Sequence, residues 1–263
     1  MGKVIFVTYA SSVYRKNIFW NKFFVRLFIR PDQILIYTDD DLKASNIYKD
    51  NRDIFDTTRG GGYWAWKPWV ISKAIERADE GDVVIYQDCG KGFKYKNFRR
   101  PVNIIEYALN NDAMPGVLVP IHGNNIDWTH QKCFELMNCC DERFYDSPMI
   151  EASISAWKVN ARTKGFINEW RAYCLNADVV GDLPVDYSRL DGSFLNHRYD
   201  QSVLTNLVIK RDLKPVELSF NDVHLSKSIS LVDLDLGKRG LCLWGVLKLI
   251  RFFVFVKKSV LRK

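Results

Sequence analysis

The chain lacks the cysteine patterns of disulfide frameworks and metal sites. Its six cysteines show no C-x-x-C pair and no ligand spacing with the four histidines. They are Cys89, Cys133, Cys139, Cys140, Cys174 and Cys242. No long apolar signal-peptide core precedes the first polar residues, because Met1 is followed almost at once by a strand-like segment. Free thiols and a missing leader predict a protein of the reducing cytoplasm.

Linkers and internal repeats are also missing. No stretch rich in proline, glycine and serine divides the 263 residues, and no segment repeats. Apolar residues make up 47% and aromatic residues 14% of the chain, which excludes general disorder. We expect a main domain over residues 1–228 and a connector with a cationic apolar segment over 229–263.

Acidic residues are fewer than basic ones, and the net charge is +7. Such a balance favours an anionic partner, which could be nucleic acid, a membrane surface or a phosphorylated substrate. Much of the excess lies in the last residues of the chain, and no nucleic-acid-binding motif is present. We therefore expect no nucleic-acid partner.

Hydrophobic periodicity predicts alternating strands and helices in the first hundred residues. Strands are expected at 3–8, Gln33–Thr38 and 83–86, with helices at 17–29 and from Pro68 to about residue 79. This order predicts an α/β domain with a mostly parallel central sheet flanked by helices. Later strands are expected at 116–121, 150–157 and 216–218, and later helices at 102–110, 130–137, 163–174 and 200–209, the last capped by Asp200.

The densest pattern is Gly60-Gly61-Gly62-Tyr63-Trp64-Ala65-Trp66-Lys67-Pro68, followed by a helix and the strand that ends at Asp88. Glycines let a backbone approach a ligand closely, and Lys67 can meet a phosphate. The strand delivers Asp88 to the carboxyl edge of the sheet, where open α/β sheets bind ligands. The pattern indicates a nucleotide-sugar site, although a surface lysine and a loop-capping aspartate are the alternatives.

These motifs, together with Tyr199-Asp200-Gln201-Ser202-Val203-Leu204, resemble bacterial polysaccharide-type glycosyltransferases with a GT-A-like fold. More distantly, the chain is similar to retaining galactosyl- and glucosyltransferases of the Asp-X-Asp type. The resemblance covers roughly residues 3 to 224. It implies a Rossmann-type, nucleotide-sugar-binding domain, with a UDP-sugar favoured as donor and a hexosyl group transferred.

The resemblance also implies a divalent cation, Mn or Mg, on the donor diphosphate. Asp88 matches the last aspartate of Asp-X-Asp, whereas Gln87 or Tyr86 stands where the family has the partner carboxylate. His224 matches a C-terminal histidine that the distant family places on the metal or diphosphate. We therefore predict Asp88 and His224 as metal ligands and leave the need for a metal open.

The remaining site residues follow from position. Asp200 and Gln201 match an Asp-Gln pair that borders the transferred sugar, and Glu151 is a candidate base facing the acceptor. The alternative for Asp200 is a helix cap, and the alternative for Glu151 is a position on the solvated face of a strand. The predicted donor-binding residues are Thr8, Tyr9, Asp39, Trp66, Lys67, Gln87 and Asp88. Trp64 and Trp66 either stack on the ligand or pack beneath the sheet.

Residues 241–263 combine an aromatic and aliphatic run with Lys248 and Arg251 inside it and further cations after it. A spanning helix needs about 20 mostly apolar residues, so these charges favour a helix lying on the anionic inner membrane surface. A last helix packed on the domain is the alternative.

The sequence thus predicts a cytoplasmic glycosyltransferase, peripheral on the inner face of the membrane. It would transfer a sugar to a lipid-linked glycan acceptor in lipopolysaccharide, O-antigen or capsule synthesis. The alternatives are a nucleotidyltransferase on a similar sheet and a non-enzymatic basic module that binds membrane or nucleic acid. A nucleotidyltransferase is expected to have a glycine-rich basic loop directly after the first strand, and residues 8–12 contain no glycine.

Overall fold

A computed structural model describes residues 2–89, 104–118, 123–184 and 194–217. Its main sheet has the strand order β2-β1-β3-β7-β4. These strands are β1 (Val4–Ala10), β2 (Gln33–Thr38), β3 (Val83–Gln87), β4 (Ala113–Met114) and β7 (Ile154–Lys158). β2, β1 and β3 run parallel, and β7 is antiparallel to both β3 and β4. The expectation of an α/β domain with a mostly parallel central sheet is confirmed.

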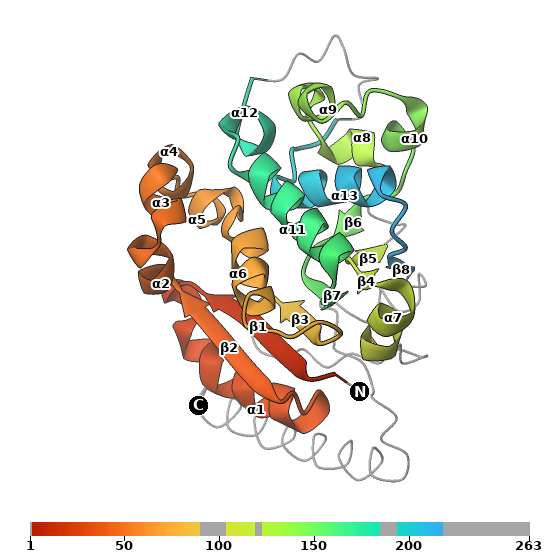
Figure 1. Cartoon of the computed structure of the whole chain (residues 1–263). Coiled ribbons are helices and arrows are strands. Elements are labelled where there is room, and N and C mark those ends of the chain that lie inside the picture. The colour runs from red at the N-terminus through yellow and green to blue at the C-terminus, as the bar shows by residue number, and fades with distance from the viewer. Residues whose placement is uncertain (1, 90–103, 119–122, 185–193, 218–263) are drawn as a thin grey trace, which may run out of the picture.

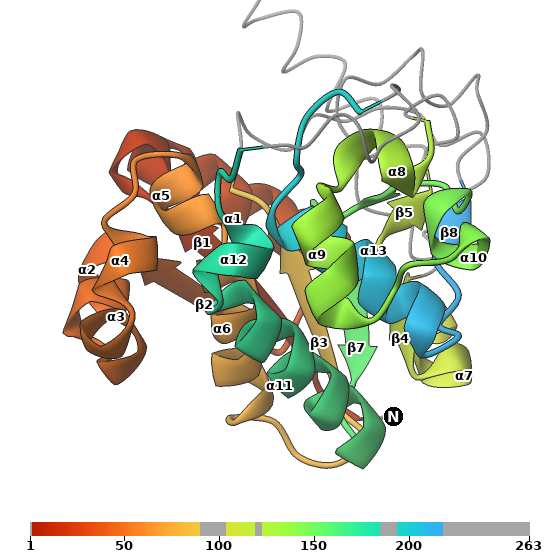
Figure 2. The ribbon, with the colours of Figure 1, turned by 90° about the horizontal axis from the view of Figure 1, so that it is seen from above.

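Helices cover both faces of the main sheet (Figures 1 and 2). α1 (Ile18–Phe28) and α7 (Ile104–Asn111) pack on one face, where Val25 and Ile105 join Phe6 and Ile85 in a core cluster. α6 (Trp66–Ile75) and α11 (Ala161–Cys174) pack on the other face. All seven residues of β1 are buried, as expected for a parallel strand that is covered on both faces. This burial explains why the sequence of the strand is an almost continuous apolar run.

Short helices connect and surround these elements. They are η1 (Ser12–Asn17), α2 (Asp39–Ala44), α3 (Asn46–Asp50), α4 (Arg52–Phe55), α5 (Gly60–Tyr63), α8 (Asn125–Trp128), α9 (Gln131–Met137), α10 (Glu142–Tyr145) and α12 (Ala177–Val180). α13 (Asp200–Lys210) lies in the second half of the domain, and eight of its eleven residues, Asp200 and 202–208, are buried. A smaller sheet has the order β6-β5-β8, formed by β6 (Ile150–Glu151), β5 (Val117–Leu118) and β8 (Val216–Glu217).

Two local expectations were wrong. The strand expected over 150–157 is two strands, because the chain turns at Ala152 and Ser153 and passes from the smaller sheet to the main one. The cap of α13 is Tyr199, whose φ is 53°, and Asp200 is the first residue inside the helix. Its carboxylate is engaged by a lysine from another helix and does not cap the backbone.

Candidate functional site at the carboxyl edge of the sheet

The candidate site lies where the parallel strands end. Ala10, Thr38 and Gln87 close β1, β2 and β3 at one edge. β7 runs the opposite way, so its first residues reach the same edge, and the Asp88 N–H donates to the Ser153 carbonyl at 2.9 Å. The edge therefore gathers polar residues from both directions of the chain, as expected for a ligand site in an open α/β sheet.

A buried charge cluster stands at this edge. Lys67, in the first turn of α6, is 4% exposed, and its Nζ lies 2.9 Å from Asp200 Oδ2 and 3.8 Å from Asp88 Oδ1. The Tyr86 hydroxyl donates to Asp88 Oδ1. The side chain of Asp200 is 4% exposed and that of Asp88 is 41% exposed. One ammonium thus joins a buried carboxylate to one that reaches solvent.

The pKa values in the cluster follow from burial and pairing. Burial lowers the pKa of Lys67, but the carboxylates of Asp200 and Asp88 outweigh it, and the net pKa is raised. Burial raises the pKa of Asp200 to about 6, against the opposing effect of Lys67. Burial and then Asp88 raise the pKa of Tyr86 well above its usual value. Near neutral pH Lys67 is therefore a cation, Asp200 is a carboxylate and Tyr86 is a protonated phenol.

The glycine run forms a left-handed turn in front of α6. Five consecutive residues have positive φ: Gly60 60°, Gly61 61°, Gly62 94°, Tyr63 53° and Trp64 58°. A Cβ on Gly62 would lie 2.9 Å from the Phe55 Cα, so this glycine permits close packing of two backbone segments. Tyr63 and Trp64 hold a conformation that costs non-glycine residues about 1 to 2 kcal/mol each. Strain of this kind gathers at functional sites.

The turn does not present a row of open N–H groups to a ligand. The N–H groups of Gly61, Gly62 and Tyr63 donate to the carbonyls of residues 58, 57 and 59. Its role is to set the direction of side chains: Trp66 Nε1 donates to the Gly60 carbonyl at 2.9 Å, and Lys67 follows directly. We infer that the glycines position Trp64, Trp66 and Lys67.

A cavity of about 560 Å³ lies on the side of the turn that faces β1 and β2. Tyr9 and Trp66 form a stacked pair in its wall, with ring centroids 4.1 Å apart. Asp39 lines it and accepts a hydrogen bond from the Ser12 N–H at 2.9 Å. The other lining residues are Ser11, Ser12, Val13, Tyr14, Leu42, Lys43, Tyr48, Phe55, Thr58, Gly60, Gly61, Trp64, Asp88 and Cys89. Flat rings beside a carboxylate suit a base and its ribose.

A second cavity, of about 300 Å³, adjoins the first, because Trp64 and Asp88 line both. Gln201 lines it, and its Oε1 accepts from the Ala152 N–H at 3.4 Å. Glu151 also lines it and accepts from the Ser153 hydroxyl at 3.0 Å. The remaining lining residues are Arg59, Lys67, Ser153, Asn196, His197, Arg198, Tyr199 and Asp200. This cavity is small and strongly polar.

A set of contacts that the sequence did not reveal, here called the brace, joins the glycine turn to the start of α13. Arg59 pairs with Asp182 at 2.9 Å, and the Tyr199 hydroxyl donates to Asp182 at 2.8 Å. The Tyr199 ring lies 5.4 Å from Tyr63 and 5.6 Å from Trp64 between centroids. Arg59 directly precedes the glycine motif and Tyr199 is the first residue of the motif at 199–204, and these positions were the available signal.

The structure brings most predicted residues to these two cavities. The exceptions are Thr8 and Gln87, which line neither. Thr8 is buried in the sheet and its hydroxyl donates to the Gln87 carbonyl at 2.6 Å. Gln87 is 8% exposed, and within the described part of the chain its Oε1 has no hydrogen-bond partner. His224 lies outside the described residues, as does the segment 241–263.

The described residues do not assemble a metal site at Asp88. No group of three or more histidine, cysteine or acidic side chains is placed to hold an ion within residues 2–89, 104–118, 123–184 and 194–217. Asp88 and Asp200 already share the Lys67 ammonium, whose charge opposes a dication. A divalent cation and its ligand His224 stay predictions.

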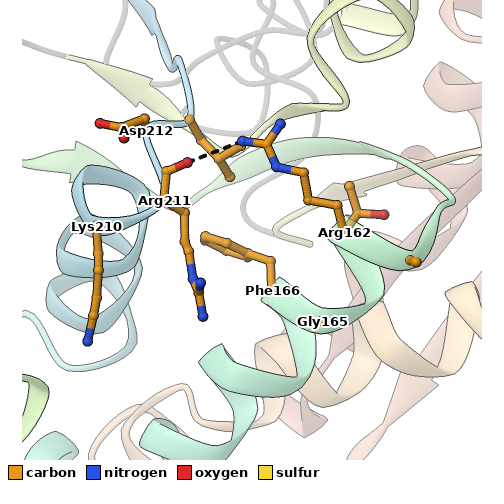
Figure 3. A pocket seen from close by; sticks show the side chains of 9 residues that line it. Arg162, Gly165, Phe166, Lys210, Arg211 and Asp212 are labelled. Atoms are coloured by element: carbon orange, nitrogen blue, oxygen red, sulfur yellow. Dashed lines mark hydrogen bonds between the residues drawn. The ribbon is translucent and has the colours of Figure 1, made fainter.

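A third hollow, of about 510 Å³, lies between the start of α11 and the end of α13 (Figure 3). Lys158, the last residue of β7, pairs with Val83, the first residue of β3, and α11 begins shortly after Lys158. The hollow therefore lies at the opposite edge of the sheet from the candidate site. Arg162 donates to the Arg211 carbonyl at 3.2 Å, and Arg211 pairs with Glu169 at 2.5 Å. Because these cations already bind protein groups, we assign the hollow a structural role.

No protein-family model matches the chain, and no curated protein matches it. Among solved structures, it is similar to the apo structure of WbbM, a bifunctional glycosyltransferase, with a TM-score of 0.39 and 10% identity. The match covers 78% of this chain but only 37% of the other. A likeness at that level carries no functional argument, so the function must be argued from the site. None of the helices in the described ranges is long and apolar enough to cross a membrane.

Proposed function

We propose that the protein is a glycosyltransferase that uses a nucleotide-sugar donor, with a UDP-sugar favoured. The observation that carries the proposal is the pair of adjoining cavities that share Asp88 and Trp64. The larger one, with its stacked rings, would take the nucleoside. The smaller, polar one would take the sugar. The diphosphate would then pass the shared residues, beside the Lys67 ammonium.

The charge cluster suits transfer of a sugar. As the bond between sugar and diphosphate breaks, the leaving group gains negative charge and the sugar gains positive charge. Lys67 is a fixed cation that needs no reorganisation to oppose the first charge, and the Asp200 carboxylate opposes the second. Gln201 would orient sugar hydroxyls. Glu151 would accept the proton of the acceptor hydroxyl.

We further propose a lipid-linked glycan acceptor and a location on the inner face of the membrane, in bacterial surface polysaccharide synthesis. Support comes from the sequence of residues 241–263, whose aromatic, aliphatic and cationic composition suits an anionic bilayer surface. The division into a catalytic domain over 1–228 and a tail over 229–263 belongs to the same proposal. The alternatives are a nucleotidyltransferase and a basic binding module without enzymatic activity.

A thermal-shift screen with UDP-, GDP-, CMP- and dTDP-sugars, each with and without Mn²⁺, tests the function directly. A donor present at 100 times its Kd should stabilise the native state by about 2.7 kcal/mol, or roughly 5 to 10 °C in Tm. Trp66→Ala should lose most of this shift, whereas Trp128→Ala changes a tryptophan that lines neither cavity. Release of nucleoside diphosphate from the stabilising donor then reports turnover.

The same assay separates the alternatives. Stabilisation by nucleoside triphosphates with release of pyrophosphate would favour a nucleotidyltransferase. Stabilisation by oligonucleotides alone, lost in high salt, would favour a basic binding module. Failure of every nucleotide sugar to stabilise the protein would overturn the proposal.

A further inference from the structure

The outer face of residues 12–30 exposes an unusual number of large apolar side chains. Phe19 is 69% exposed, Trp20 44% and Phe23 41%, and Val13 and Tyr14 in the preceding turn are also exposed. Phe19 and Trp20 meet edge to face at 5.3 Å, and Trp20 and Phe23 at 6.1 Å. We call these five residues, with the cations described next, the basic aromatic face. Contiguous apolar surface of this kind marks an interaction site.

Helix periodicity explains how this face arises. Asn21, Val25 and Ile29 recur at four-residue spacing and are buried, and the two apolar ones belong to the core cluster beneath the sheet. Phe19 and Phe23 follow the same spacing on the outer side. Figure 1 shows α1 on the sheet face opposite α6. Core packing thus holds the aromatic residues outward.

The face is strongly cationic. Residues 11–31 contain no aspartate or glutamate and five basic residues, which are Arg15, Lys16, Lys22, Arg26 and Arg30. Only Arg15 among them is ion-paired within the described part of the chain, to Asp40 at 2.7 Å. Lys22 and Arg26 are like charges at i and i+4, which slightly destabilises an isolated helix. Their mutual spacing therefore does not stabilise α1.

We propose that the basic aromatic face docks on an anionic lipid bilayer. Aromatic rings and long cationic side chains on one helix face suit the interface, where rings enter the boundary of the acyl chains and cations meet lipid phosphates. The charge is complementary to such a surface, and within the described part of the chain only Arg15 of these cations is paired with an acidic group. Val13 and Tyr14 belong both to the face and to the wall of the larger cavity, so docking brings the rim of that cavity to the membrane.

This inference stands apart from the proposed glycosyltransferase activity, since it needs no donor and no turnover. It also differs from the proposed role of residues 241–263, because it assigns a second contact to the folded domain. The test must therefore report the position of α1 in the full-length protein.

The experiment measures binding of the full-length protein to phosphatidylcholine vesicles with and without phosphatidylglycerol, and the quenching of its tryptophan fluorescence by lipids brominated on the acyl chain. We expect wild-type protein to be quenched more than Trp20→Phe, which keeps an aromatic ring but removes the reporter. The double variant Lys22→Glu/Arg26→Glu should weaken binding to anionic vesicles by at least about 25-fold, as each cation near the surface is worth about fivefold.

Lys132→Glu/Lys214→Glu is the matched control, because it makes the same change in net charge at two exposed lysines in the second half of the domain. It should weaken binding only a few-fold. Equal quenching of wild type and Trp20→Phe would overturn the proposal and leave the membrane contact to other parts of the chain. Equal weakening by the two charge-reversal variants would also overturn it. Thermal unfolding of each variant checks that the fold is retained.

Discussion

Lys67 Nζ lies 2.9 Å from Asp200 Oδ2, and both side chains are almost completely buried. The lysine comes from the first turn of α6 and the aspartate from the first residue of α13, so the ion pair joins the two halves of the domain at the candidate site. Buried pairs of this kind contribute little net stability, but loss of one partner strands a charge in a medium that cannot solvate it. The pair can therefore be tested by energetics as well as by catalysis.

We predict that Lys67→Met lowers the free energy of unfolding by up to about 3 to 5 kcal/mol, because Asp200 loses its counter-ion. Adding Asp200→Asn should recover most of that loss while activity stays absent. Urea unfolding of wild type, both single variants and the double variant gives the coupling energy. Lys73→Met on the same helix breaks an exposed pair with Glu76 and should cost well under 1 kcal/mol. Additive losses at Lys67 and Asp200 would contradict the pairing.

Asp88→Asn should lower turnover of the nucleotide-sugar donor by about 100-fold or more, because the carboxylate stands where both cavities meet. The fold should tolerate the change, since the Asp88 side chain is 41% exposed. Donor hydrolysis at saturating donor, with Mn²⁺ and without it, measures the effect. Asp146→Asn, at an exposed helix end, is the control. Near-normal turnover of Asp88→Asn would remove this residue from the site.

Activity should fall as the pH drops through about 6, because the pKa of Asp200 is raised to about 6 and its carboxylate is needed against the developing sugar charge. Below that value kcat/KM should drop about tenfold per pH unit. The raised pKa means that protonation of Asp200 stabilises the native state as pH falls, so this loss of activity should precede unfolding. Circular dichroism at the same pH values separates the two. A flat kcat/KM from about pH 7 to 5 would contradict the assignment.

The sequence predicted the parts of the fold that depend on local pattern. The strand Gln33–Thr38 has the expected bounds, and β1, β3, α7, α9 and α11 lie within a few residues of theirs. Periodicity failed at Ile150–Trp157, since alternation cannot show that a chain leaves one sheet and enters another at Ala152 and Ser153.

The candidate site was predictable only in its motif residues. Lys67, Asp88 and Asp200 were all predicted as site residues, but their contact with one another depends on tertiary packing of α6, β3 and α13. Asp200 was expected as a possible cap, and only its burial beside Lys67 shows why it is not one. Arg59 and Asp182 carry no motif, so the brace through them was visible only in the structure.

The glycine turn gives a stability prediction with an internal control. Gly62→Ala should destabilise strongly, because the new Cβ would lie 2.9 Å from the Phe55 Cα in a conformation with φ of 94°. Gly61→Ala should cost only about 1 kcal/mol, since the space beside Gly61 is open and only its φ of 61° is unfavourable. Thermal unfolding of both variants tests the difference. Equal losses would mean that the left-handed turn is not as described.

A buried histidine pair beside the smaller cavity has fixed protonation. His197 Nδ1 accepts from the His130 backbone N–H at 3.3 Å, and His130 Nδ1 accepts from the Cys133 N–H at 3.0 Å. The rings lie 4.0 Å apart between centroids. Burial lowers the pKa of both histidines, and the effect is strongest for His197. The neighbouring His130 lowers the pKa of His197 further. A proton on either Nδ1 would face an N–H donor, so both rings are neutral in the native state.

We predict that this pair makes the protein acid-sensitive. Because the native pKa values lie below the unfolded value of about 6.5, the stability due to the neutral rings is complete above that pH and is lost as the pH falls below it. By about pH 5.5 the loss should reach at most about 1.4 kcal/mol for each ring. His197→Asn keeps an oxygen for the His130 N–H but does not titrate, so its unfolding free energy should depend less steeply on pH than that of wild type, even if it is lower near neutrality.

Asp200 acts in the opposite sense over the same range, and Asp200→Asn should therefore steepen the loss of stability in acid. Urea unfolding of the three proteins between about pH 7.5 and 5.5 compares the slopes, and identical slopes for wild type and His197→Asn would show that the histidine pair does not control the acid response.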